Sequence, residues 1–240
     1  MENNRGNAQI TGCRLDQQDA FGWTPQREDN LTLAVIADGM GGLKNGALAA
    51  QTVVSTILNG LPAALTPEQI PITLEQLTDA ADRLIHNQLP GSGSTVCILA
   101  VLQNKMWWAT VGDSMVSLYR NGKLYKINRF HDAQTEALRH SLRTGKAAVH
   151  TQAQGLTSYL GMGGLASMEL AHTGFILQPG DCIMLCTDGV YRTLNEQFLQ
   201  EALRLPAQQS ADIMIEEIAH AGLSDQDNAT VLVYHFDEKR

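Results

Sequence analysis

The sequence has no long apolar run and is short of basic residues. Its 240 residues include 17 Lys and Arg against 25 Asp and Glu, giving a formal net charge of −8. This charge argues against a non-specific nucleic-acid binder, which needs clustered cations for the phosphates. No apolar run is long enough to cross a bilayer, and the N-terminal residues 1–6 are polar, unlike a targeting segment. We therefore expect a cytoplasmic protein with neither a nucleic-acid nor a membrane partner.

Cysteines are few and do not form a metal or redox motif. They are Cys13, Cys97, Cys182 and Cys186. None lies in CxxC spacing, and three stand in apolar, strand-like runs, where cysteine is usually a small buried hydrophobic residue. Free thiols in a reducing compartment are the simpler expectation.

The composition is that of one globular domain spanning 1–240, with 44% apolar and 18% charged residues. Apolar residues at helical spacing predict helices over 46–61, from about residue 73 to the residue before Pro90, and over about 195–204 and 209–221. Apolar runs predict strands at 31–37, 96–102, 105–111, 181–187 and 229–234. The turn residues Gln103-Asn104 and Asn121-Gly122 predict two hairpins, which we expect in the same meander.

Acidic residues stand at the ends of several predicted strands. Asp38 ends the first of them and precedes a glycine, and Asp188 repeats this arrangement. Asp19, Asp113 and Asp227 also lie beside apolar strands. Taken alone, an Asp-Gly pair after a strand is more often a turn. The glycine also allows a backbone carbonyl to approach a ligand closely.

If these carboxylates converge at one end of a sheet, cations must lie among them, because like charges repel. Oxygen ligands favour Mg²⁺ or Mn²⁺ over zinc. Two such ions about 3.5–4 Å apart acidify a bridging water and stabilise both oxygens of a phosphoryl displacement. Arg14, near Asp19, offers a planar fork for phosphate oxygens, although, taken locally, such charges are more often those of a solvated turn.

Residues 128–158 form a basic segment within an acidic protein. Its basic residues are Arg129, His131, Arg139, His140, Arg143, Lys146 and His150. A partly helical segment of this charge either faces an anionic substrate or is a solvated helix face, and the sequence favours neither.

Six short motifs occur in an order that resembles a known family. They are Arg14-x-x-x-Gln18-Asp19, Ala37-Asp38-Gly39-Met40-Gly41-Gly42, Gly93-Ser94-Thr95, Val111-Gly112-Asp113-Ser114, Thr187-Asp188-Gly189 and Asp227-Asn228-Ala229-Thr230. Over nearly the whole chain they resemble the metal-dependent protein phosphatases of type 2C, the PPM family, in their bacterial form. The resemblance implies an α+β fold, a four-layer α-β-β-α sandwich in which two antiparallel sheets are flanked by helices.

The resemblance also implies roles for the site residues. Asp38 bridges two Mn²⁺ or Mg²⁺ ions, the carbonyl of Gly39 binds one, Asp188 and Asp227 hold the other, Asp19 contacts the metals directly or through water, and Asp113 helps to hold a looser third ion. Arg14 binds the phosphoryl group. A metal-bridging hydroxide attacks phosphorus in line, so that phosphoserine and phosphothreonine are hydrolysed without a phosphoenzyme. The partners implied are phosphorylated proteins, with a cognate Ser/Thr kinase and its targets.

The sequence departs from the family pattern in three places. Gln18 stands where members often have Glu. Met40 stands where many eukaryotic members have a His that serves as general acid, and a thioether cannot donate a proton. The family's flap corresponds to about 128–158, where the match is loose. The general acid and the physiological substrate are therefore left open.

Two alternative functions fit the same fold. One is a catalytically inactive phosphatase-fold binding module or scaffold, which we would expect to have lost at least one of Asp38, Asp188 and Asp227, although all three are present. The other keeps the chemistry but acts on a small phosphate ester or on phosphohistidine.

Overall fold

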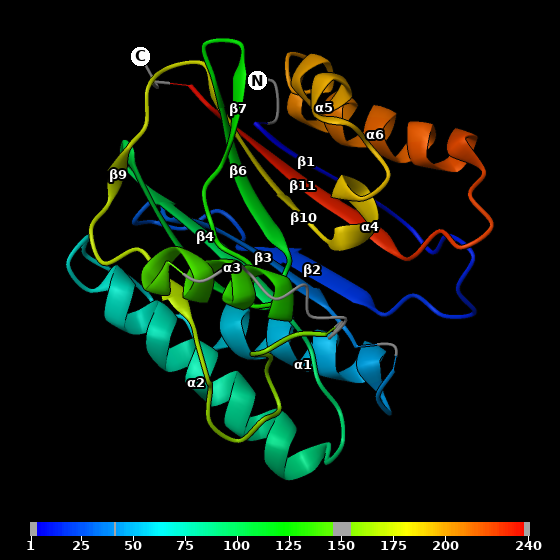
Figure 1. The fold of residues 1–240 in the computed structure, drawn as a ribbon. Coiled ribbons are helices and arrows are strands. Elements are labelled where there is room, and N and C mark those ends of the chain that lie inside the picture. The colour runs from blue at the N-terminus through cyan, green and yellow to red at the C-terminus, as the bar shows by residue number, and fades with distance from the viewer. Residues whose placement is uncertain (1–3, 41, 146–154, 238–240) are drawn as a thin grey trace.

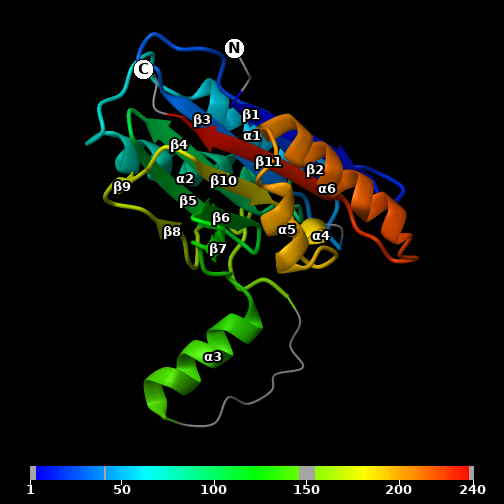
Figure 2. The same cartoon turned by 90° about the horizontal axis from the view of Figure 1, so that it is seen from above.

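Two antiparallel sheets lie face to face, with helices covering both outer faces (Figures 1 and 2). The computed structural model of the chain describes residues 4–40, 42–145 and 155–237. The expected four-layer α+β sandwich is confirmed. Among the described residues, no helix combines the length and apolar character needed to cross a membrane.

Each sheet is built from strands that are distant in the sequence. The first sheet has the order β1 (Arg5–Ile10), β11 (Ala229–Phe236), β10 (Asp181–Cys186), β6 (Met115–Arg120) and β7 (Lys123–Lys126). The second has the order β2 (Asp19–Trp23), β3 (Thr32–Asp38), β4 (Val96–Leu102), β5 (Lys105–Val111) and β8 (Glu169–Leu170), and β9 (Phe175–Ile176) also pairs with β5.

Strand β4 shows why the central strands are apolar on both faces. Cys97, Leu99 and Val101 point into the layer between the sheets, and the alternate residues Ile98 and Ala100 point toward the helices. Successive side chains of a strand face opposite sides, so a strand buried on both sides has no polar positions. The continuous apolar runs that predict strands in the sequence are therefore the middle layers of the sandwich.

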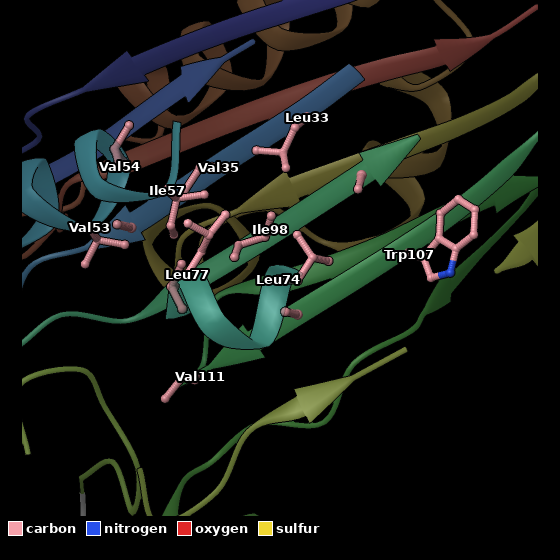
Figure 3. Close-up of a cluster of buried hydrophobic side chains, with 14 of the residues drawn as sticks. Leu33, Val35, Val53, Val54, Ile57, Leu74, Leu77, Ile98, Trp107 and Val111 are labelled. Carbon is pink, nitrogen blue, oxygen red and sulfur yellow. The ribbon is translucent and has the colours of Figure 1, made fainter. Parts of the chain in front are cut away.

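In the described part of the chain, five helices cover the outer faces of the sheets. The helices α1 (Gly46–Asn59) and α2 (Ile70–Gln88) cover β3, β4 and β5, where Val53, Ile57, Leu74 and Leu77 pack on the sheet (Figure 3). The helices α5 (Glu196–Ala202) and α6 (Ala207–Ala221), with the short α4 (Asp188–Tyr191), cover the other sheet. The predicted start of the second helix, near Thr73, is wrong by three residues. Pro71 lies in its first turn, where a fixed φ and a missing N–H are tolerated.

The two predicted hairpins form, but the expectation that they share one meander is wrong. Strands β4 and β5 turn at Gln103, and β6 and β7 turn at Asn121-Gly122, both of which have positive φ. Between the hairpins the chain crosses from one sheet to the other. Gly112 makes this crossing with φ +98°, and a Cβ there would lie 2.6 Å from Cγ2 of Thr95. Turn chemistry is local, and so it cannot reveal which sheet a hairpin joins.

The basic segment contributes a helix that stands apart from the sandwich. Helix α3 (Ala133–Thr144) has no buried residue. Its N-cap is Asp132, whose Oδ1 accepts a hydrogen bond from the backbone N–H of Thr135 at 2.6 Å. Figure 2 shows it projecting away from both sheets. Lys146 and His150 lie outside the described residues.

The cysteines are all free, and three are buried in the sandwich. Cys97 lies between the sheets, and Cys182 and Cys186 face the helices of the first sheet. Burial raises the pKa of all three thiols, because the thiolate would lose its hydration. These residues act as small hydrophobic side chains, and Cys13 is exposed.

The layer between the sheets holds the sandwich together, and it is sensitive to cavities. Leu185 is fully buried there, and we expect Leu185→Ala to lower the free energy of unfolding by about 2–5 kcal/mol. Urea unfolding of the two proteins measures the difference. Leu142→Ala is the control, because this side chain on α3 is 77% exposed and should change the free energy by less than about 0.5 kcal/mol. An equal effect of both substitutions would contradict the layer assignment.

Candidate functional site

Asp19 and Asp38 lie directly opposite each other on neighbouring strands. Asp19 is the first residue of β2 and Asp38 the last of β3, and the antiparallel register pairs the two. Directly opposite residues of an antiparallel pair have their Cβ atoms about 4.5–5.5 Å apart. Two carboxylates therefore share one end of the second sheet.

The main chain of Asp38 is fixed by the beginning of β4. Its carbonyl accepts hydrogen bonds from the backbone N–H of Thr95 at 2.8 Å and from the Ser94 hydroxyl at 3.0 Å, and its own N–H donates to Oγ1 of Thr95 at 3.0 Å. The Gly-Ser-Thr motif of the sequence is thus the neighbour that holds the end of β3 in place. Met40 continues this contact, because its N–H donates to the carbonyl of Gly93 at 3.0 Å.

The Asp19 carboxylate joins the two sheets. Its Oδ2 accepts hydrogen bonds from Oγ1 of Thr187 at 2.9 Å and from Oγ1 of Thr230 at 2.6 Å. Both threonines belong to the first sheet side of the sandwich, next to β10 and in β11. Oδ1 of Asp19 is buried and has no hydrogen-bond partner among the described residues. One oxygen is therefore oriented by hydroxyl groups while the other stays available.

Gly39 and Gly189 follow their acids because the backbone leaves no room for a side chain. A Cβ at Gly39 would lie 2.2 Å from the carbonyl oxygen of Gly46, and one at Gly189 would lie 2.1 Å from the carbonyl oxygen of Asn228. Real Cβ atoms do not approach backbone atoms so closely. The repeated Asp-Gly pair is thus explained by close packing, whether or not a carbonyl also binds a ligand.

Asn228 holds the loop that carries Arg14. Its Oδ1 accepts from the N–H of Gln18 at 2.8 Å, and its Nδ2 donates to the carbonyls of Thr11 at 2.7 Å and Asp16 at 3.1 Å. One side chain next to β11 therefore fixes the loop between β1 and β2 from three sides.

The three outer acids are paired with arginines. Arg14 Nη2 lies 2.7 Å from Asp227 Oδ2. Arg192 Nη2 lies 3.2 Å from Asp188 Oδ2 and 3.4 Å from Asp113 Oδ2. Asp113 reaches this position because the chain crosses between the sheets just before it. Asp188 reaches it because it is the first residue of α4, which follows β10.

Burial and mutual repulsion shift the carboxyl groups toward their neutral forms. Burial, opposed by its two hydroxyl donors and reinforced by Asp188 and Asp227, raises the pKa of Asp19 to about 7. Burial and then repulsion from Asp19 raise the pKa of Asp38 well above its ordinary value. Burial and Asp188 raise the pKa of Asp113 to about 6, and burial raises that of Asp188. Charges this crowded favour a bound cation.

The donor chemistry fits a hard divalent cation. Carboxylate oxygens dominate the site, and the unpartnered Oδ1 of Asp19 is an orphaned buried acceptor. In the part of the chain that the structure describes, no three carboxylate, imidazole or thiolate side chains stand at the mutual spacing of a metal site. The outer carboxylates are instead in ion pairs with Arg14 and Arg192.

The structure brings together the acids that the sequence singled out, together with four residues to which the sequence reasoning gave no role. Asp19, Asp38, Asp113, Asp188 and Asp227 influence one another electrostatically. The additional residues are Thr187, Thr230, Asn228 and Arg192. The first three lie inside the quoted motifs, and a polar side chain close to an acid in such a motif is the sequence signal that could have identified them. Arg192 follows Asp188 by four residues, the spacing of neighbours on a helix.

Known proteins are similar to this chain in sequence and in fold. The chain is 27% identical over 224 residues to the serine/threonine phosphatase stp of Listeria monocytogenes, covering 88% of this chain and 87% of that one. The solved S. agalactiae serine/threonine phosphatase superposes with a TM-score of 0.83 at 22% identity, covering 97% and 99% of the two chains. The catalytic domain of the phosphatase PstP, solved with two manganese ions, gives 0.77 at 23% identity, covering 96% of each.

A family model settles the classification. The model described as protein phosphatase 2C matches residues 14–226, a range that contains Arg14, Asp19, Asp113 and both Asp-Gly pairs and ends one residue before Asp227. The chain therefore belongs to the protein phosphatase 2C family.

Proposed function

We propose that the carboxylate cluster at the ends of β2, β3 and β10 is the active site of a metal-dependent protein phosphatase. As a member of the 2C family, the chain is a serine/threonine phosphatase that uses Mn²⁺ or Mg²⁺. The observation that supports this location is the pairing of Asp19 with Asp38, within electrostatic reach of Asp113, Asp188 and Asp227.

The proposed metal ligands are Asp19, Asp38, the carbonyl of Gly39, Asp113, Asp188 and Asp227. When bound, the divalent ions supply positive charge that polarises water and the phosphoryl oxygens. Asp38 offers its carboxylate from a main chain fixed by Thr95, and Asp19 from a carboxylate oriented by Thr187 and Thr230. Ligands held in this way need no rearrangement during the reaction, which favours catalysis.

Arg14 is the proposed phosphoryl-binding residue. Its side chain is 49% exposed, and one terminal nitrogen pairs with Asp227. A guanidinium binds two oxygens of a phosphoryl group at once, so it holds the substrate in a defined orientation beside the acids. Met40 carries no proton to donate, so the proton for the leaving oxygen has a different source.

The domain organisation and the substrates are part of the same proposal. Residues 1–240 would form a single catalytic domain, and about 128–158 its flap, whose helix α3 projects beside the sandwich. Phosphorylated proteins are the substrates, and we propose targets of a cognate Ser/Thr kinase in the cytoplasm among them.

Replacing Asp38 tests the site. Asn keeps the shape of the side chain but removes the negative charge that attracts a cation. We therefore expect Asp38→Asn to lower kcat/KM by at least about 100-fold. Substitution of residues that only orient metal ligands costs up to about this factor. Mn²⁺-dependent hydrolysis of p-nitrophenyl phosphate and of a phosphothreonine peptide measures it. Asp212→Asn, on the exposed face of α6, is the control and should leave turnover unchanged.

Three outcomes would count against the proposal. Unchanged turnover in Asp38→Asn would place the site elsewhere. A wild-type protein that binds Mn²⁺ without hydrolysing either substrate would be a scaffold. Faster hydrolysis of a small ester or of phosphohistidine than of the peptide would indicate a different substrate class.

The hydroxyl groups that orient Asp19 give a second prediction. Thr230→Val keeps the volume and removes a hydrogen bond, so we expect a loss of about 10–100-fold in kcat/KM. Thr110→Val is a matched control, because Thr110 is a fully buried strand threonine whose hydroxyl has no partner among the described residues. This control should keep full activity. Equal losses in the two variants would show that the hydrogen bond to Asp19 is not the cause.

The raised pKa values predict how the metal-free protein responds to pH. Groups whose pKa is higher when folded stabilise the protein below their unfolded pKa and lose this effect as pH rises through the folded value. For Asp19, with a pKa of about 7, the loss falls between about pH 4 and pH 7. We expect the melting temperature of metal-free protein to fall over this range relative to Asp19→Asn, and Mn²⁺ to reduce the fall.

The comparison with Asp19→Asn is needed because histidines act in the opposite sense. Burial lowers the pKa of His131 and His235, so these two histidines make the folded protein more stable as pH rises. Both histidines are present in the wild type and in the variant, and their contribution cancels. Parallel melting curves of the two proteins across the range would contradict the prediction.

A further inference from the structure

Arg192 stands on the solvent side of two of the site's carboxylates. It is the residue after α4, and its backbone N–H donates to the carbonyl of Asp188 at 3.0 Å. This helical turn places its side chain over Asp188, four residues earlier. Its Nη2 also reaches Asp113, which comes from the crossing between the sheets. A single guanidinium nitrogen therefore joins acids from two separate segments.

The position of Asp113 beside α4 is reinforced by the preceding residue. The Tyr191 hydroxyl donates to the carbonyl of Asp113 at 3.1 Å, and its ring stacks on Phe130 with centroids 5.1 Å apart. The crossing and α4 are thus held together without Arg192. The arginine is not required to keep the two carboxylates near each other.

Arg192 is far more exposed than the two acids that it contacts. The side chain of Arg192 is 65% exposed, whereas those of Asp113 and Asp188 are 13% and 14% exposed. A cation that binds these carboxylates comes close to a guanidinium nitrogen that lies 3.4 Å from Asp113 and 3.2 Å from Asp188. Repulsion between two positive charges then opposes binding unless the arginine moves away.

A second ion pair in the same protein shows what a permanent pair looks like. Arg120 binds Asp181 through two nitrogens, with Nε to Oδ1 at 2.7 Å and Nη2 to Oδ2 at 2.5 Å, and Asp181 is 2% exposed. Arg192 instead shares one nitrogen between two acids at 3.2 and 3.4 Å. Longer contacts made through one nitrogen of an exposed arginine hold their partners more weakly than a bidentate pair does.

We propose that Arg192 is a displaceable counter-cation, which neutralises Asp113 and Asp188 in the metal-free enzyme and gives way when a divalent ion binds there. The inference rests on the proposed function, which makes these two acids metal ligands. Arg192 then sets the affinity of the outer metal position, because each ion bound must first break the ion pairs. A residue that only positioned the ligands would have the opposite effect on affinity.

Titration calorimetry of the metal-free protein with Mn²⁺ tests the proposal. We expect Arg192→Gln to tighten the weaker Mn²⁺ binding step by about 3- to 10-fold, as expected for removing two exposed ion pairs. Arg192→Lys keeps the positive charge and should stay near the wild-type affinity. Arg139→Gln is the control, because Arg139 forms an exposed ion pair with Glu136 on α3, and it should leave Mn²⁺ binding unchanged.

Thermal melting gives a readout that is independent of activity. Without metal, Arg192→Gln leaves two acids unneutralised, so its melting temperature should fall below that of the wild type near pH 8, and Mn²⁺ should raise it by a larger interval. Equal or weaker Mn²⁺ binding by Arg192→Gln would overturn the role of Arg192 alone. Absence of Mn²⁺ uptake by the wild type would overturn the proposed function as well.

Discussion

Repulsion among buried carboxylates is the constraint on which the rest of this structure depends. Asp19 and Asp38 face each other across two strands, and three further acids add to the negative charge. An unpaired buried charge is costly, so every acid in such a cluster needs donors or cations. The threonine hydroxyls on Asp19 and the arginines on the outer acids meet this need within the chain. The repulsion at Asp38 and the unpartnered Oδ1 of Asp19 favour the binding of divalent metal ions.

The site belongs to both sheets, so it forms only when the sandwich is assembled. Asp19 lies on β2 of one sheet, yet the hydroxyl groups that orient its carboxylate come from Thr187 and Thr230 on the other. The apolar layer between the sheets brings these residues together, because burial of that layer drives the two sheets face to face. Stability of the sandwich and geometry of the site therefore depend on the same contacts.

Local patterns predicted most of the elements, and they failed where long-range packing decides. The turns at Gln103 and Asn121-Gly122 follow from backbone preferences of their own residues, and both hairpins form. The assignment of the hairpins to a single meander was wrong, because Gly112 sends the chain across to the other sheet. Likewise, the glycines after Asp38 and Asp188 are required by close packing against Gly46 and Asn228, and no sequence pattern shows such a contact.

The sequence by itself determined which acids stand at strand ends, because apolar runs adjoin them. The order of its short motifs carries the resemblance to the family, and that resemblance implied the layered fold. Only the tertiary structure decided how the acids are neutralised. The register that sets Asp19 against Asp38, the hydroxyl groups that cross between the sheets and the reach of Arg192 to Asp113 all join residues far apart in the chain. Such contacts depend on how the two sheets pack against each other, and this packing is a property of the whole apolar layer rather than of any local pattern.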